Sequence, residues 1–280
     1  MISEAVKLSF VGKLRFGAGV IRWFAQNGRV LLTLILTILV WEFAVWLFDF
    51  PRYLLPAPSA IVEEFSERWR SVVPHAAATL WIIVVGYLIA AAVSIPLALI
   101  IAFSRFLETT LYPIVVLFQI VPKIAVAPLF LIWFGFGIAP KLLLVFLISF
   151  FPITVSSIAG FKSVSPEIMD FSRSTGADGW TIFRKIRLPA ALPSIFVGLK
   201  VASAFAATAA VVAEFVASDK GLGFLLLQYN GDLDTAMAFA AIVILSSIGL
   251  GLYYIVEWLE RLIIPWRVPT AGQNVEAGVG

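Results

Sequence analysis

Three charged side chains, Glu42, Lys123 and Glu214, lie inside long apolar runs of this sequence. Charged residues in such runs usually face a water-filled path, pair with one another, or relay protons and ions. Lys123 stands between Pro122 and Pro128, which should kink the chain and free backbone carbonyls for water or another partner. Two interpretations of Lys123 follow: it lines a translocation path for anionic or polar solutes, or it pairs with an acid such as Glu214.

The other charges in these runs have structural interpretations. Glu214 is a second candidate for the path, but it also precedes a glycine-containing segment, residues 218–227, that its carboxylate could cap. Glu42 lies about 9 Å from the outer end of its helix and should reach the interface or pack against a neighbouring helix. The ammonium of Lys200 should extend along its helix to the inner surface.

Several kinds of chemistry are excluded by residue type. The chain has no cysteine and one histidine, His75, so disulfides, thiolate metal sites and His-rich metal sites are not expected. A phosphate-binding loop of the form G-x-x-x-x-G-K-[ST] is absent, because Gly12 and Lys13 are followed by Leu14 and lack the first glycine. We therefore expect no metal, no bound cofactor and no ATP hydrolysis by this chain.

The composition is that of a membrane protein. The 280 residues are 61% apolar and 13% charged, with a mean hydropathy of +1.01, whereas a soluble domain has about 25% charged residues. Runs of about 20 apolar residues are long enough to cross a bilayer as helix. We predict an all-α integral membrane protein with six spans, at residues 30–48, 79–103, 113–134, 141–160, 193–217 and 236–256.

The predicted organisation has four parts. They are a basic N-terminal segment (1–29), a first span with an extracytoplasmic segment (30–78), a five-helix core (79–266) that includes the 161–190 loop, and a flexible tail (267–280). With the N-terminus inside, the cytoplasmic segments hold 13 of the 20 Lys and Arg residues. Cytoplasmic loops accumulate these residues, so both termini and the 161–190 loop should face the cytoplasm. The same asymmetry explains the net charge of +3 without a nucleic-acid partner.

The 161–190 loop is the most polar interior stretch. Ser165 and Pro166 form a helix start, and Gly176 provides a left-handed stop. A second helix should begin near Asp178 and end before Pro189. It carries both apolar and basic side chains: Trp180, Phe183, Ile186, Arg184, Lys185 and Arg187.

The apolar side chains of this loop must cover something. They could pack on the inner ends of the chain's own helices or in the headgroup layer, or they could form a docking surface for a soluble partner. A DNA-reading helix-turn-helix is disfavoured, because a span on each side leaves little room for a duplex.

The loop resembles the cytoplasmic EAA signature of permease subunits of bacterial ABC importers. That signature has an acidic residue, two small residues, three of any type, a glycine, nine of any type, then Ile-x-Leu-Pro. The matching residues here are Asp170, Phe171, Ser172, Gly176, Ile186, Leu188 and Pro189. Phe171 departs from the pattern, because the family usually has alanine there. Residues 54–65, 121–137, 188–202 and 211–227 further resemble the nitrate/sulfonate/taurine (NitT/TauT) branch of these permeases.

The resemblance implies a fold, a location and partners. The fold would be the MetI-like type I importer permease fold in the bacterial inner membrane, with EAA coupling helices. Trp180 and Phe183 would join the matching residues in contacting a dimer of ATPase subunits, which would use ATP and Mg²⁺. An extracytoplasmic solute-binding protein, a second permease copy and membrane lipid would be the other partners. The solute would be a pyrimidine or thiamine precursor, riboflavin, a sulfonate, taurine or nitrate.

The alternative function is an ion-coupled secondary transporter. In that case Lys123, Glu42 and Glu214 would form a charge relay, and internal hydropathy repeats would be expected. No convincing repeat is present in the sequence.

Overall fold

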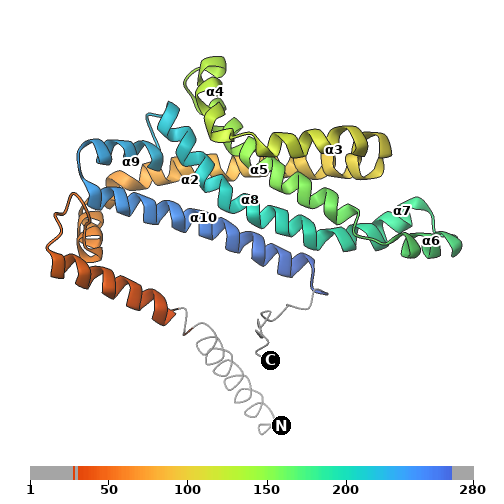
Figure 1. The fold of residues 1–280 in the computed structure, drawn as a ribbon, viewed down its shortest axis with the longest axis horizontal. Coiled ribbons are helices and arrows are strands. Elements are labelled where there is room, and N and C mark those ends of the chain that lie inside the picture. Colours follow the sequence, from red (N-terminus) through yellow and green to blue (C-terminus); the bar gives the residue numbers. More distant parts are fainter. Residues whose placement is uncertain (1–27, 29–30, 267–280) are drawn as a thin grey trace, which may run out of the picture. The chain divides into compact units, whose positions relative to one another are not determined.

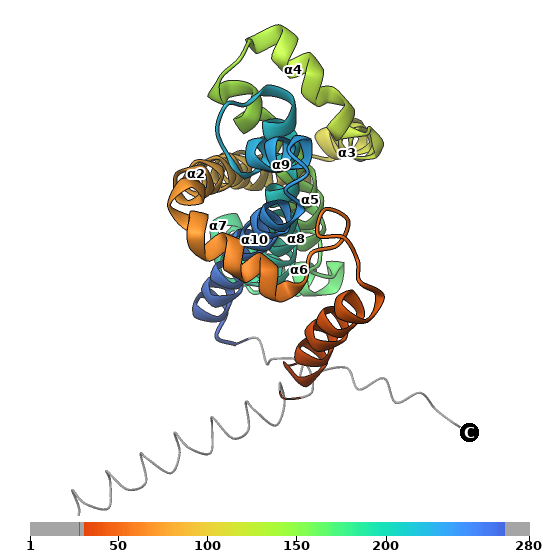
Figure 2. The same cartoon turned by 90° about the vertical axis from the view of Figure 1, so that its left-hand side faces the viewer.

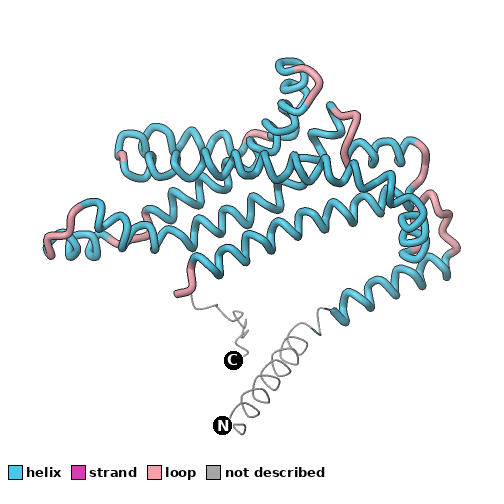
Figure 3. Tube along the Cα trace, turned by 180° about the vertical axis from the view of Figure 1, so that it is seen from behind, coloured by secondary structure: helices cyan, strands magenta, loops and turns pink. Residues whose placement is uncertain are grey.

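The computed structural model describes residue 28 and residues 31–266. Apart from Gly28, the predicted basic N-terminal segment and the predicted tail from residue 267 onward lie outside the described residues. All regular structure in the described part of the chain is helical (Figure 3). The chain divides into two compact units, one formed by residues up to 67 together with 233–237, and the other by residues 68–232 and from 238 onward.

In the first unit, the helix Leu31–Phe48 leads to the start of α2. Glu42 links the two elements, because its carboxylate accepts hydrogen bonds from the Ser59 amide at 3.0 Å and the Ser59 hydroxyl at 2.6 Å. Ser59 lies in the first turn of α2, whose backbone N–H groups have no partner within the helix. The expectation that Glu42 packs against a neighbouring helix is therefore confirmed.

Within the part of the chain that the structure describes, five helices are long and apolar enough to cross a membrane, and the number rises to six if one bent pair counts as a span. Besides Leu31–Phe48 they include α5 (Ile138–Phe161), α8 (Leu188–Ala217) and α10 (Thr235–Ile263), each over a predicted run. The fifth is α2 (Pro58–Phe103), which contains the predicted span 79–103 but begins well before it.

The predicted span 113–134 is not one straight helix. It is formed by α3 (Arg105–Ile120), a 3₁₀ turn (Lys123–Val126) and α4 (Ala127–Phe134), and the two halves meet at 85°. The break lies at Val121, whose φ of −57° and ψ of 130° are extended because a residue before proline is pushed out of the helical region. The kink expected around Lys123 is thus confirmed, and it is a sharp bend.

The second unit is built around α5 and α8, which lie side by side (Figures 1 and 2). Gly198 permits their close approach, because a Cβ there would lie 2.7 Å from the Ser156 Cβ and 2.9 Å from the Pro152 oxygen. Around this contact lies a core of small and β-branched residues that includes Ile83, Val145, Ile153, Ala202 and Ala206. The short helix α9 (Leu222–Gly231) packs against α8.

Candidate functional site

The 161–190 loop folds into two short helices joined at a glycine. The first is α6 (Pro166–Ser174), and Gly176 follows it with a φ of +78°. The second is α7 (Gly179–Ile182), and the Asp178 carboxylate caps it by accepting from the amides of Trp180 and Thr181 at 3.2 and 3.4 Å. The helix start, the glycine stop and the second start near Asp178 are therefore confirmed.

The end predicted for the second helix is wrong. From Phe183 to Arg187 the chain continues as a π-helical turn, in which the Leu188 amide bonds back to the Phe183 oxygen, and α8 then begins at Leu188. Pro189 has no N–H to donate to the preceding turn, and the π-helical turn directly before it accommodates this missing donor. The wider turn before it leaves α7 and α8 as one continuous helical rod.

The side chains of this loop divide into an outer and an inner set. Ile168, Phe171 and Trp180 have 51%, 70% and 66% of their surface exposed, and we call them the apolar docking patch. Asp170 and Gly176 are exposed beside them, and Asp170 pairs with Arg173. The inner set comprises buried Ser172 and half-buried Phe183, Ile186, Leu188 and Pro189. Large apolar side chains left open to this extent on short helices suit a surface that contacts a partner protein or the headgroup layer.

The inner set is anchored to the end of α2. The Phe183 ring meets the Phe103 ring edge-on at 5.9 Å, and the Arg187 guanidinium lies 4.5 Å from the Phe103 ring centroid. Trp180 in turn lies 5.6 Å from Phe183. A displacement of the exposed Trp180 would therefore reach α2 and α8 through packed aromatic rings. The structure thus gives Phe183, one of the predicted docking residues, a contact within its own chain.

Both carboxylates that start these helices are stabilised in their charged form. The Thr181 hydroxyl, with backbone N–H groups of α7, holds the pKa of Asp178 below its usual range. Backbone N–H bonding and the Ser165 side chain likewise lower the pKa of Glu167. Negative charge at these two N-termini also interacts favourably with the positive ends of the helix dipoles.

Lys123 and Glu214 do not pair with each other. The Lys123 ammonium donates to the Gln119 oxygen at 2.7 Å and lies 4.9 Å from the centroid of the Phe151 ring. Among the described residues, the pairing of Lys123 with an acid such as Glu214 is therefore wrong, and its place on a translocation path stays a prediction. Each of the three charges considered for a relay has its own local partner, with Glu42 bonded to Ser59.

Glu214 instead clamps the segment that leads into α9. Its carboxylate accepts from the Thr79 hydroxyl at 2.8 and 3.0 Å and from the Gly223 amide at 2.7 Å. The Thr79 oxygen accepts from the Leu222 amide at 2.8 Å, and the Gly221 amide donates to His75 Nδ1 at 3.1 Å. The expected cap is confirmed, and its context is a buried network joining α2, α8 and α9.

Two members of this region were missed by sequence reasoning. Thr79 is fully buried on α2, 135 residues away from Glu214 in the chain, and no local pattern marks it. Lys141 was counted among the basic residues and placed at the edge of a predicted span, but no role was predicted for it. It is 6% exposed and donates to the Ser218 hydroxyl at 2.5 Å. Its burial at the start of α5 is the feature that a sequence does not display.

Comparisons with known proteins agree on one family. The pattern that defines the family described as "Binding-protein-dependent transport system inner membrane component" matches residues 94–265. Riboflavin transport system permease protein RibX of Chloroflexus aurantiacus is 35% identical over 237 residues, covering 84% of this chain and 88% of that protein. Taurine transport system permease protein TauC of Escherichia coli is 30% identical over 246 residues, covering 84% and 88%.

A solved structure has the same fold. An inward-facing form of the MetNI methionine ABC transporter superposes with a TM-score of 0.56 at 19% identity, covering 70% of this chain and 95% of the matched chain. At this level of identity the likeness concerns the fold alone. The MetI-like permease fold expected from the sequence is confirmed.

Proposed function

Because the chain belongs to the binding-protein-dependent transport system inner membrane component family, we propose that it forms the membrane path of an ABC importer and that its 161–190 loop docks on a separate ATPase subunit. The observation that carries this proposal is the apolar docking patch of Ile168, Phe171 and Trp180. These side chains lie on the two short helices α6 and α7, within the stretch of sequence that resembles the EAA signature.

The partners follow from the same proposal. A dimer of ATPase subunits would receive the docking patches of two copies of this chain, and would use ATP and Mg²⁺. An extracytoplasmic binding protein would deliver the solute, and lipid would surround the exposed apolar faces of the spans. Both termini and the 161–190 loop would face the cytoplasm, as the distribution of Lys and Arg predicts.

Docking would drive transport through rigid elements. Closure of the ATPase pair would displace α6 and α7, and the continuous helix from α7 through the π-helical turn into α8 would carry the displacement into the bundle. The contacts of Phe103 with Phe183 and Arg187 tie the same motion to α2. An ion pair between Lys162 after α5 and Glu108 on α3 adds a link between two further helices. The bundle would thereby alternate between inward-facing and outward-facing states.

The solute would be a small polar or anionic molecule. Pyrimidine or thiamine precursors, riboflavin, sulfonates, taurine and nitrate are the candidates, and two of the relatives are named for riboflavin and for taurine transport. Lys123 and Glu214 remain the candidate path residues from the sequence. Glu214 is 1% exposed and fully engaged in the α9 clamp, which favours a structural role for it.

Copurification with the cognate ATPase tests the docking role. Phe171→Asp and Trp180→Asp each place a charge in the docking patch. Trp180→Asp also removes the ring contact with Phe183, so Phe171→Asp is the cleaner change. We expect the ratio of ATPase to permease recovered in detergent to fall about tenfold or more, the effect typical of a central interface residue. A Phe183→Asp exchange is less informative, because Phe183 packs against Phe103 and its loss disturbs the fold.

A matched control is available in the same chain. Phe136, 83% exposed between α4 and α5, is as accessible as Phe171 but lies outside the 161–190 loop. Phe136→Asp should retain the ATPase at the unmodified ratio. Full retention of the ATPase by both Phe171→Asp and Trp180→Asp would refute the proposed docking surface.

A further inference from the structure

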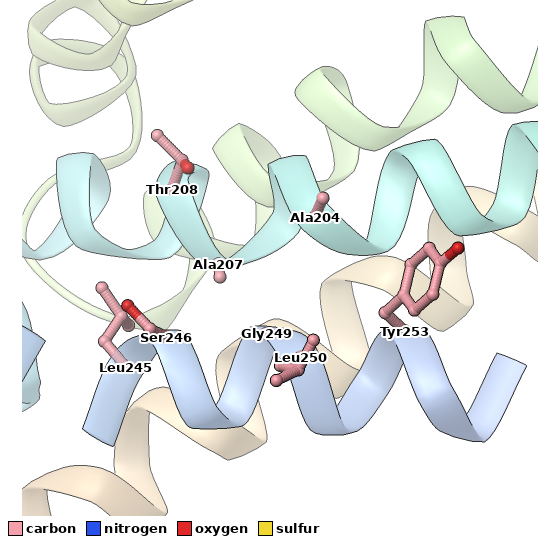
Figure 4. Close-up of a pocket in the computed structure, with 8 residues that line it drawn as sticks. All are labelled: Ala204, Ala207, Thr208, Leu245, Ser246, Gly249, Leu250 and Tyr253. Atoms are coloured by element: carbon pink, nitrogen blue, oxygen red, sulfur yellow. The ribbon is translucent and has the colours of Figure 1, made fainter. Parts of the chain in front are cut away.

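A groove runs between α8 and α10 (Figure 4). It consists of two adjoining hollows of about 400 and 450 Å³ that share Ala204 and Tyr253. Small residues form its floor, with Ala207 on α8 and Gly249 on α10. The two hollows are open to the surface and their volume is sufficient for a small molecule, and both walls of the groove belong to candidate membrane spans.

Three hydroxyl groups line this groove without a hydrogen-bond partner among the described residues. They belong to Thr208 on α8 and to Ser246 and Tyr253 on α10 (Figure 4). Ser247, the next residue after Ser246, behaves differently: its hydroxyl donates to the Val243 oxygen at 2.8 Å. The hydroxyl of a serine or threonine in an apolar helix commonly donates such a hydrogen bond to a backbone carbonyl in the preceding turn.

Unsatisfied hydroxyls facing hydrocarbon are unfavourable, because lipid offers no hydrogen bonds. Thr208 lies on α8, and Ser246 and Tyr253 lie about two turns apart on α10, so a polar occupant that moves along the groove would meet these hydroxyls in turn. Water and a hydrogen-bonding solute have this chemistry, whereas an acyl chain does not.

The charge of the groove limits what that solute can be. Lys200, at one end, is the one cation among the described residues that line the two hollows. Its ammonium lies 2.7 Å from Glu260 Oε2, and the two side chains are 19% and 9% exposed. Lys200, which was expected to extend to the inner surface, ends in this ion pair with Glu260 in the last turn of α10.

A neutralised lysine does not favour an anion. A sulfonate or nitrate would have to compete with Glu260 for Lys200, in surroundings where separating two opposite charges is costly. The remaining walls offer the hydroxyls already described, the rings of Phe205 and Tyr253, and aliphatic side chains such as Leu250 and Val201. Ring faces and hydroxyl groups together suit a flat, uncharged molecule that accepts and donates hydrogen bonds.

We propose that the α8–α10 groove is the stretch of the translocation path through which an uncharged, hydrogen-bonding heterocycle passes, with Thr208, Ser246 and Tyr253 as its contacts. This inference rests on the proposed importer function and narrows its solute class. It also assigns the path to residues other than Lys123 and Glu214. A second copy of the chain is the other conceivable occupant, and the experiment below distinguishes the two.

Cysteine accessibility tests the groove, since the chain has no cysteine of its own. Ser246→Cys, Thr208→Cys and Ser247→Cys variants are prepared as complexes with the ATPase in liposomes, with and without Mg-ATP. Each is treated with a neutral hydroxyethyl and an anionic sulfonatoethyl methanethiosulfonate reagent. Because only the thiolate reacts and an apolar environment suppresses it, we expect Ser246→Cys and Thr208→Cys to react about tenfold or more faster than the Ser247→Cys control with the neutral reagent.

The anionic reagent carries an ethanesulfonate group and so reports on the sulfonate class directly. The rate of each reagent is first divided by its rate with a free thiol in solution. On this scale, we expect the anionic reagent to modify the two groove variants more slowly than the neutral reagent does. Faster modification by the anionic reagent would overturn the uncharged solute class. Equal, low reactivity of all three variants would overturn the aqueous groove altogether.

Disulfide formation between copies provides the remaining outcome. Efficient oxidation of Ser246→Cys to a dimer, with no reaction toward either reagent, would mean that a second copy fills the groove and would overturn the proposal. ATPase copurification is measured on the same samples. If the ATPase copurifies but the groove test fails, this inference alone is refuted. If the ATPase does not copurify even with the unmodified permease, the importer function is refuted.

Discussion

Glu214 and Gly221 approach so closely that a Cβ on Gly221 would lie 2.2 Å from the carboxyl carbon of Glu214. Gly221 also has a φ of +120°, a conformation that residues with a side chain rarely adopt. The chain can therefore enter α9 at this point only because position 221 is glycine. The Gly221 amide in turn holds His75, so the same residue connects the α9 segment to α2.

A Gly221→Ala exchange should destabilise the protein strongly. Backbone strain of this kind costs about 1–3 kcal/mol, and the clash with Glu214 adds to it. Thermal unfolding in detergent, followed by fluorescence, measures the effect. Gly231→Ala, in the last turn of α9 where no atom lies within 4 Å of the added Cβ, is the control and should unfold within about a degree of the unmodified protein. Equal stability of the two variants would contradict the clamp.

Thr79 is the second member of the clamp whose loss is measurable. Thr79→Val preserves the shape of the side chain but leaves the buried Glu214 carboxylate and the Leu222 amide each without one partner. Unsatisfied buried groups cost about 1–3 kcal/mol, so the melting temperature should fall. Thr79→Ser should restore most of the loss. Thr109→Val, which removes an exposed hydroxyl bonded within its own helix, should have little effect.

These interactions also show which contacts can be predicted from the sequence and which cannot. Local rules predicted the stop at Gly176 and the helix start near Asp178, because each depends on residues within one helical turn. The glycine segment near Glu214 suggested a cap for the same reason. The partners Thr79 and Glu260 lie 135 and 60 residues from the groups they bind, and no local pattern reveals them. The sequence predicted a helix end before Pro189, but the helix continues, because the π-helical turn before Pro189 accommodates a residue without an N–H.

The cap of α7 should respond to pH. Hydrogen bonds from Thr181 lower the pKa of Asp178, so its folded-state pKa lies below the unfolded-state value of about 3.9. The stabilisation is therefore complete above that value and is lost as the pH falls through the folded-state pKa. Hydrogen exchange at the Trp180 and Thr181 amides, corrected for intrinsic rates, should accelerate at low pH.

Two variants isolate the titration of Asp178. Asp178→Ala should show the faster exchange already at neutral pH, because the cap is gone. Asp178→Asn keeps an oxygen that caps α7 but has no proton to gain in this range. Its corrected exchange should be independent of pH, and the same acceleration in the Asn variant would assign the effect to another group.

The ion pair of Lys200 and Glu260 should show coupling in a double-mutant cycle. Lys200→Met or Glu260→Gln alone leaves one charge in a largely buried position, whereas the double variant leaves none. The double variant should be more stable than the sum of the single effects predicts, with a coupling energy of about 1–3 kcal/mol. Chemical denaturation in mixed micelles measures the three variants. Additive effects would mean that the pair contributes nothing by itself.

A substitution at Phe103, which contacts Arg187, should separate docking of the ATPase from transmission of its movement to the membrane helices. Phe103 lies at the end of α2, outside the docking patch, and holds both Arg187 and Phe183 of the helical rod that leads into α8. Phe103→Leu keeps an apolar side chain but removes the ring that both partners contact. The ATPase should therefore copurify normally, while stimulation of its activity by the solute-loaded binding protein should fall several-fold. Phe106→Leu, at a side chain that is 73% exposed, should change neither measurement. Normal stimulation in Phe103→Leu would mean that the displacement reaches the bundle by α8 alone.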